Sequence, residues 1–213
     1  ESCLALPKGM EKEVELVPYQ NIAAVVEANV SIEAIQETEE KLLDAILAHD
    51  RVVREIFQQV SMLPLRFGNA FALRENIIND LQNNQQQYLN ILTKLQQQAE
   101  YTITFTPVSY PSTLEVSKVR GKAYLLAKKQ QFEQQQAFQT KQRQQWENIR
   151  QLIFKNYPKA VFRDSTESKI KQVHLLANRD ARVITTEELS TWQTECSYWQ
   201  ITLSEQLPPY HFV

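Results

Sequence analysis

The sequence predicts an α+β protein with two domains, and three observations support this fold class. Apolar residues recur at helical spacing over three long segments, they alternate with polar residues over several short ones, and the first pattern gives way to the second near Ala99. The long helical segments are residues 32–59, 74–98 and 116–157. We therefore divide the chain into residues 1–98, an N-terminal α+β domain with two long helices, and residues 99–213, a C-terminal domain.

Composition excludes several classes of protein. The chain has 213 residues, a formal net charge of -2 and 43% hydrophobic residues, which is ordinary for a globular protein with a real core. A nucleic-acid-binding protein needs a basic face, so we expect no nucleic acid as a partner. No apolar run approaches the roughly 20 residues that span a bilayer, so we expect no membrane association either.

Cysteine usage gives no support for a metal or redox site. The only two cysteines are Cys3 and Cys196, and they form no CxxC pair. We expect both thiols to stay reduced in a cytoplasmic protein.

The N-terminal domain is predicted to begin with strands near Val14–Val17 and over Ile22–Val26, where β-branched residues are frequent. Ser31 can cap the first long helix. One buried stripe is expected on that helix, formed by Ile35, Leu42, Leu43, Ile46, Val53, Ile56 and Phe57. The second long helix follows from Arg74 and carries asparagine and glutamine on its solvated face.

The C-terminal domain is predicted to have the order strand, helix, strand, strand, helix, strand. Its strands are expected at residues 101–107, 171–177, 182–184 and 199–203. Asn178, Arg179 and Asp180 are expected to turn the second of these strands into the third, as a hairpin. Thr185 and Glu188 form a capping-box pattern that opens a short helix ending near Glu195. This order indicates a modified ferredoxin-like fold whose first crossover carries a helical insertion at about residues 116–157.

The insertion is rich in glutamine and polar almost all round between Gln130 and Gln145. Such a segment is either a projecting arm or a helical hairpin. It must bend between Gln134 and Gln144 if both of its ends pack on one domain.

The segment SMLPLRFGNAF, residues 61–71, joins the two long helices of the first domain. Pro64 denies a continuing helix, and Gly68 permits a positive φ. We expect Leu63, Leu65 and Phe67 to bury this connection, and Asn69 to help start the next helix. Arg66 has two interpretations: its guanidinium forks onto a carboxylate or carbonyls and locks the helices together, or it contacts a partner.

No catalytic constellation is evident. His49, His174 and His211 are far apart in sequence and fit no metal or nucleophile motif, so we predict no enzyme, no cofactor and no metal site. We interpret His49 as a packing or hydrogen-bonding residue of its helix, and His174 as solvated, because it alternates with Val173 and Leu175. The candidate structural or interaction residues are His49, Pro64, Arg66, Phe67, Gly68 and Tyr210.

Several segments, in the same order, resemble those of one known family. LPLRFGNAF is similar to the signature of the gas vesicle protein GvpF/GvpL family. The agreeing segments are NIAAVVE at 21–27, AHDRVVREIF at 48–57, GKAYLLAKK at 121–129 and the tail LPPYHFV at 207–213. The short strand that usually opens the family is not evident here, and the glutamine-rich insertion is unusual.

The resemblance implies an accessory or minor structural protein of gas vesicles. It implies two α+β domains and binding to the wall protein GvpA, during assembly or on the gas-facing side of the shell. It also implies other gas vesicle accessory proteins as partners and a location in the cytoplasm at the vesicle. The alternative that we consider is a regulatory protein that binds a small ligand, because ferredoxin-like sheets often pair and bind metabolites.

Overall fold

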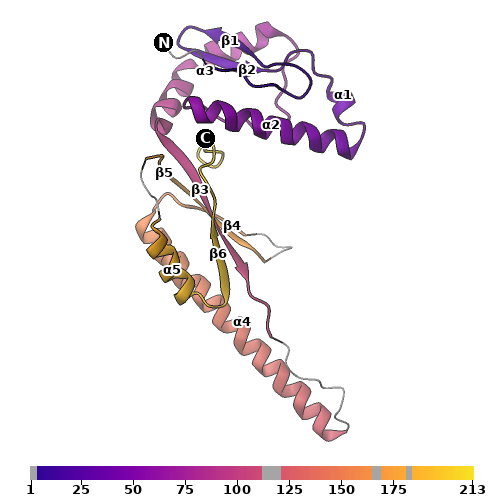
Figure 1. The fold of residues 1–213 in the computed structure, drawn as a ribbon, viewed down its shortest axis with the longest axis vertical. Coiled ribbons are helices and arrows are strands. Elements are labelled where there is room, and N and C mark those ends of the chain that lie inside the picture. The colour runs from indigo at the N-terminus through magenta and orange to yellow at the C-terminus, as the bar shows by residue number, and fades with distance from the viewer. Residues whose placement is uncertain (1–3, 112–120, 165–168, 181–183) are drawn as a thin grey trace. The chain divides into compact units, whose positions relative to one another are not determined.

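The computed structural model describes residues 4–111, 121–164, 169–180 and 184–213. Its contacts divide the chain into two compact units. Unit 1 consists of Glu1–Glu100, Leu176–Ala181 and Gln206–Val213, and unit 2 of Tyr101–Leu175 and Arg182–Glu205. The division into two domains at a single point, between residues 98 and 99, stays a prediction. The contact units are not continuous in sequence, because unit 1 also contains Leu176–Ala181 and Gln206–Val213 (Figure 1).

Unit 1 contains a small antiparallel hairpin. Strand β1, Glu15–Tyr19, pairs with β2, Ile22–Val26, in a register that places Tyr19 opposite Ile22. Gln20 takes a positive φ of 48° in the tight turn between them. The prediction of a strand over Ile22–Val26 is confirmed, and β1 lies close to the predicted position.

Three helices complete unit 1: α1, Ile32–Ile35; α2, Glu39–Gln59; and α3, Arg74–Leu95. The prediction of one continuous helix over residues 32–59 is therefore wrong. Thr38 has an extended backbone, and its hydroxyl accepts a hydrogen bond from the backbone N–H of Lys41. This cap starts a new helix at a point where apolar periodicity alone does not reveal a break.

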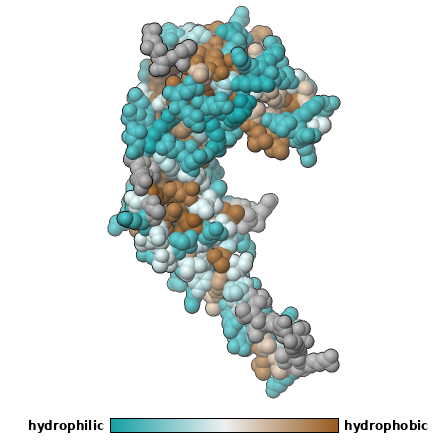
Figure 2. Space-filling view, in the orientation of Figure 1, coloured by the Kyte–Doolittle hydropathy of each residue, from teal (hydrophilic) through white to brown (hydrophobic). Residues whose placement is uncertain are grey.

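The buried face of α2 is narrower than expected. Val53, Ile56 and Phe57 are buried as predicted, together with Ala45. Leu43 and Ile46 were expected in the same stripe but are 55% and 40% exposed. The C-terminal half of α2 thus supplies the core, and its N-terminal half leaves apolar side chains at the surface. Figure 2 shows a brown patch toward the right-hand end of unit 1, where this half of α2 lies.

Unit 2 is built on a four-stranded sheet of order β4-β5-β3-β6. Its elements are β3, Gln98–Pro107; α4, Lys122–Asn156; β4, Val161–Asp164; β5, Lys171–Asn178; α5, Thr186–Glu195; and β6, Trp199–Leu203. The pairs β3–β6 and β4–β5 are antiparallel. The order of element types is the predicted one, and β5 confirms the strand expected at residues 171–177, but strand β4 was not predicted.

The hairpin partner of β5 is β4, which precedes it, and not the predicted return strand at residues 182–184. Residues 181–183 lie outside the described part of the chain. The sequence pattern missed β4 because it has only 4 residues, of which just Val161 and Phe162 are apolar.

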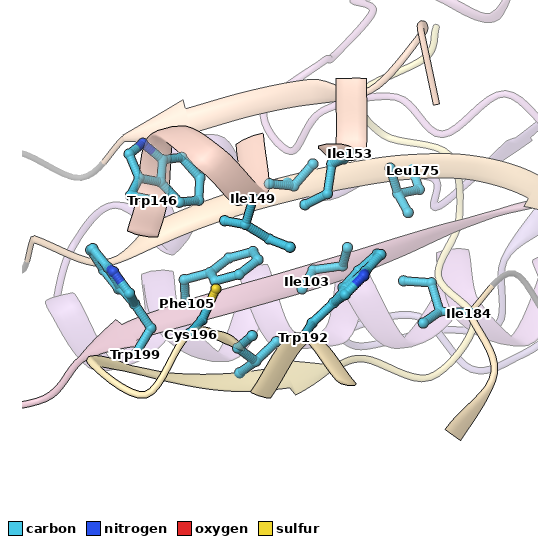
Figure 3. Close-up of a cluster of buried hydrophobic side chains, with 12 residues drawn as sticks. Ile103, Phe105, Trp146, Ile149, Ile153, Leu175, Ile184, Trp192, Cys196 and Trp199 are labelled. Atoms are coloured by element: carbon cyan, nitrogen blue, oxygen red, sulfur yellow. The ribbon is translucent and has the colours of Figure 1, made fainter. Parts of the chain in front are cut away.

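Both helices of unit 2 pack on one face of the sheet. Figure 3 shows Trp146, Ile149 and Ile153 of α4 meeting Phe105 of β3 and Trp192 of α5. The Phe105 and Trp146 rings lie edge to face, with centroids 5.2 Å apart. Cys196 is buried in the same cluster, and burial, with the nearby Glu195 charge, raises the pKa of its thiol to about 11. The thiol therefore stays protonated at neutral pH and acts as a core residue.

α4 is one unbroken helix of 35 residues. The predicted bend between Gln134 and Gln144 is absent because the two ends do not both pack: only the C-terminal half lies on the sheet, and the N-terminal half runs past it (Figure 1). The helix is a projecting arm, which is one of the two alternatives that the composition left open.

The expectation that His174 is solvated is wrong. It is 4% exposed on β5, and its Nδ1 lies 3.0 Å from the hydroxyl oxygen of Thr102 on β3. Alternation along a strand identifies which side chains share a face, but it does not show whether the second face is also covered.

Candidate interaction surface

The connection between α2 and α3 is an irregular segment with a sharp turn. Pro64 is buried, and Gly68 has a φ of 93°, as the sequence predicts for a glycine at this place. Asn69 does not cap α3. Its side-chain amide instead donates to the backbone oxygen of Arg66, 2.9 Å away, and closes the turn.

His49 attaches this segment to α2. Its Nε2 lies 3.0 Å from the backbone oxygen of Leu65, and its ring meets that of Phe67 edge to face with centroids 5.7 Å apart. The imidazole therefore has a hydrogen-bonding and packing role on the surface of unit 1.

The segment leaves four large apolar side chains at the surface. Leu65, Phe67, Phe71 and Leu73 are 55%, 38%, 45% and 61% exposed, and we call them the apolar loop. The expectation that Leu65 and Phe67 bury the connection is wrong, because only Pro64 is buried and Leu63 is half-buried. Clustered exposure of this kind typically marks an association surface.

Arg66 lies within the apolar loop and is exposed. The carboxylate fork that would lock α2 to α3 is not found among the described residues. Arg74 does make such a pair at the start of α3, since its guanidinium lies 3.0 Å from the carboxylate of Glu15 on β1. This leaves the Arg66 guanidinium available at the surface.

The C-terminal tail, residues 207–213, is bound to unit 1. Leu207 exchanges two backbone hydrogen bonds with Glu100, each of 2.9 Å, and the next two prolines, Pro208 and Pro209, are fully buried. The Glu100 carboxylate then accepts the backbone N–H of His211 at 2.9 Å and lies 2.8 Å from its Nδ1. The tail is thus fixed along its length.

Tyr210 joins the tail to α2. Its hydroxyl donates to Asp50 at 3.1 Å, and the other Asp50 oxygen accepts from Arg54 at 2.6 Å. Burial, followed by the charge and hydrogen bond of Asp50, holds the pKa of Tyr210 above its ordinary value. The phenol is therefore neutral and remains a donor at physiological pH.

Arg179, the residue that follows β5, makes a further contact with α2. Its guanidinium lies 3.6 Å from the centre of the Phe57 ring and donates to the Phe57 backbone oxygen at 2.5 Å. The sequence pattern marked Tyr210 but missed Asp50, Glu100 and Arg179. The i,i+4 spacing of Asp50 and Arg54 was a usable signal, whereas nothing in the sequence marks Glu100 as buried.

This surface is suited to association. His49 and Tyr210 each use a polar atom to hold part of the fold in place, and the apolar loop that His49 contacts is exposed together with the polar Arg66 and Asn69. Among the described residues, no helix is both long enough and apolar enough to cross a bilayer.

Comparison with known protein families gives a match over nearly the whole chain. Residues 3–213 match the model of the family described as gas vesicle synthesis protein GvpL/GvpF. No curated protein sequence matches the chain significantly.

Two solved structures share its fold. The crystal structure of the gas vesicle protein GvpF from Anabaena sp. PCC7120 aligns with a TM-score of 0.64 and 15% identity, covering 97% of this chain and 88% of that one. The crystal structure of GvpF from Microcystis aeruginosa aligns with a TM-score of 0.60 and 13% identity, covering 97% and 91%.

Proposed function

Because this chain belongs to the gas vesicle synthesis protein GvpL/GvpF family, we propose that it binds the wall protein GvpA, during assembly of the shell or on its gas-facing surface. A wall subunit has apolar surface that must meet gas, and that surface is prone to aggregate in water. A protein that covers or seeds such surface needs exposed apolar side chains of its own.

The apolar loop is the observation that carries this proposal. Burying a large apolar side chain contributes about 1.5–3 kcal/mol, so four partly exposed ones offer at most about 6–12 kcal/mol before the costs of association. These side chains are only partly exposed and association has its own cost, so the apolar loop supplies part of the binding free energy and further contacts supply the rest. Arg66 at its centre adds a charge that selects the partner's orientation.

Co-purification with GvpA tests the proposal. Leu65→Ser with Phe71→Ser should reduce recovery of GvpA at least tenfold and change thermal melting only slightly, because about half of each side chain is already exposed to solvent. The matched control is Leu152→Ser with Phe154→Ser, an exposed leucine and phenylalanine on α4, which should bind normally. Equal binding by all three proteins would contradict a role for the apolar loop.

Arg66→Ala separates the two interpretations of this residue. Since its side chain is exposed, we expect the melting temperature to stay within about 1–2 °C and GvpA binding to weaken. A clear loss of stability with unchanged binding would favour the structural interpretation.

Antibody labelling of vesicles addresses the place of binding. A signal that appears only after the vesicles collapse would support the gas-facing side. Binding to GvpA without any vesicle signal would support a role limited to assembly. No binding at all would contradict the proposal and favour a small-ligand regulatory protein.

A further inference from the structure

The N-terminal third of α2 presents unpaired acids beside exposed leucines. Leu43 and Leu47 lie one turn apart and are 55% and 58% exposed. Glu39, Glu40 and Asp44 are exposed on the same turns, and no lysine or arginine pairs with them among the described residues. We call these five residues the acidic face. It is separate from the apolar loop.

The N-terminal half of α4 presents the opposite charge in the same arrangement. Leu125, Leu126 and Phe132 are 68%, 60% and 60% exposed on the part of α4 that projects past the sheet. Lys122, Lys128 and Lys129 lie between and beside them. We call these six residues the basic face.

The charges of the basic face are largely unused. Lys129 pairs with Glu133 at 3.8 Å, but both side chains are well exposed, so the pair is weak. The Lys128 ammonium lies 5.8 Å from the centre of the Tyr124 ring, and no carboxylate pairs with Lys122 among the described residues. The three lysines therefore keep most of their charge available.

We propose that the basic face of one chain binds the acidic face of a second copy of the same chain, helix against helix. Each face has two or three exposed large apolar side chains and three charges of one sign, so like faces repel and unlike faces attract. The two faces are different surfaces of one protein, so the contact is head-to-tail. Such a contact is not limited to a dimer, and repeated it forms a ring or an open chain of copies.

Size indicates that this association is weak. Each face covers about three helical turns or fewer, so the contact falls below the roughly 1,200–2,000 Å² of stable interfaces. We expect the average mass to rise with protein concentration, with association detectable above ~10–100 µM, and to fall as salt screens the charges.

Charge reversal tests the proposal by sedimentation velocity of the full chain. The acid-reversed variant is Glu39→Lys, Glu40→Lys and Asp44→Lys, and the base-reversed variant is Lys122→Glu, Lys128→Glu and Lys129→Glu. Each alone carries two faces of like sign and should remain monomeric. An equimolar mixture should associate again, because every face then has an opposite partner only on the other variant.

The control has the same change in net charge as the acid-reversed variant, at exposed acids outside both faces: Glu11→Lys, Glu13→Lys and Glu195→Lys. It should associate as the unaltered chain does. Circular dichroism of each variant confirms that it is folded.

Two results would overturn the inference: a monomer at every concentration in the unaltered chain, or variants that stay monomeric when mixed. GvpA binding is measured with the apolar-loop variants, which leave both charged faces intact, and self-association is measured with the charge-reversed variants. A failure of the GvpA proposal is therefore distinguishable from a failure of the self-association proposal.

Discussion

The carboxylate of Glu27 organises the first loop of the protein. Its two oxygens accept the backbone N–H groups of Met10 and Glu11 at 2.7 Å and of Lys12 at 2.9 Å. Gly9 is required beside it, because a Cβ there would overlap the same carboxylate. Burial acts to raise the pKa of Glu27, but the three N–H groups and the charge of Lys12 together outweigh it and lower the pKa.

Glu27→Gln should destabilise unit 1 by about 1–3 kcal/mol, because the amide NH₂ that replaces one carboxylate oxygen cannot accept the N–H groups bound there, and the remaining oxygen carries no charge. The pH dependence follows from the lowered pKa: the stabilising contribution is complete above the ordinary value of 4.5 and is lost as pH falls through the folded-state pKa. Urea unfolding at pH 7 and below pH 4 measures both effects. An equal loss at the two pH values would contradict a role for the ionised carboxylate.

Tyr210→Phe should cost about 0.5–1.5 kcal/mol of unfolding free energy. The change removes one partly buried hydrogen bond and leaves Asp50 paired with Arg54. Asp50→Ala should cost more, because it leaves both the partly buried phenol and the Arg54 guanidinium without this acceptor. Chemical denaturation measures both effects, and a neutral Asp50→Ala would show that the Tyr210–Asp50 hydrogen bond does not stabilise the tail.

At the scale of elements, the glutamines of α4 have two different roles. Gln142 donates to the backbone oxygens of Val108 at 3.1 Å and of Tyr198 at 2.9 Å. Gln145 accepts the backbone N–H of Tyr198 at 3.0 Å. Two residues of the run thus satisfy backbone groups at the end of the sheet, and others, such as Gln135, face solvent.

Gln145→Ala should lower the stability of unit 2 by about 1–3 kcal/mol, because it leaves the partly buried N–H of Tyr198 unpaired. Gln142→Ala should cost less, about 0.5–1.5 kcal/mol, because the Tyr198 oxygen keeps its hydrogen bond from the Val108 N–H. Gln135→Ala and Gln136→Ala are matched controls on the exposed part of the same helix and should change stability by less than about 0.5 kcal/mol. Thermal melting with far-ultraviolet dichroism distinguishes the pairs, and equal effects would show that all four glutamines are equivalent.

Local patterns predicted elements that carry their own signals. The capping box at Thr185 and Glu188 is present in full, and YTITFTP lies within β3, with Ile103 and Phe105 buried. Strand β4 has too few residues to show a period, and the break at Thr38 depends on one hydroxyl. Neither strand β4 nor the helix break at Thr38 can be recognised from sequence periodicity.

The residues of the candidate interaction surface were predictable only where the local backbone conformation requires that residue type. Gly68 was predicted because a turn needs its positive φ. Glu100 was not, because its partner His211 is 111 residues away and nothing near it in sequence requires a carboxylate. The exposure of Leu65 and Phe67 also eluded prediction, since apolar residues next to a buried proline are ordinarily buried.

On the scale of the whole molecule, unit 1 is completed by segments far apart in the sequence. Residues 1–100 supply its helices and hairpin, whereas Arg179 and the C-terminal tail come after most of unit 2. The prolines of the tail are among its most buried residues.

A fragment of residues 1–100 should therefore be less stable than unit 1 in the full chain. Adding a peptide of residues 205–213 should raise its melting temperature, by an amount equivalent to about 2.7 kcal/mol at one hundred times the dissociation constant. A peptide with Pro208 and Pro209 both replaced by serine is the control. A fragment that melts identically with and without the native peptide would show that the tail contributes nothing to unit 1.

The late position of the tail also affects the order of events on the ribosome. Residues 101–205 must be made between the body of unit 1 and its last segment, which at about 5–20 residues per second takes on the order of 5–20 s. During that interval the places later filled by Pro208 and Pro209 are open, and Asp50 lacks its phenol partner. A nascent chain of this protein thus exposes apolar surface until Pro208, Pro209 and Tyr210 have been added and have packed, and it is a candidate for chaperone capture during that interval.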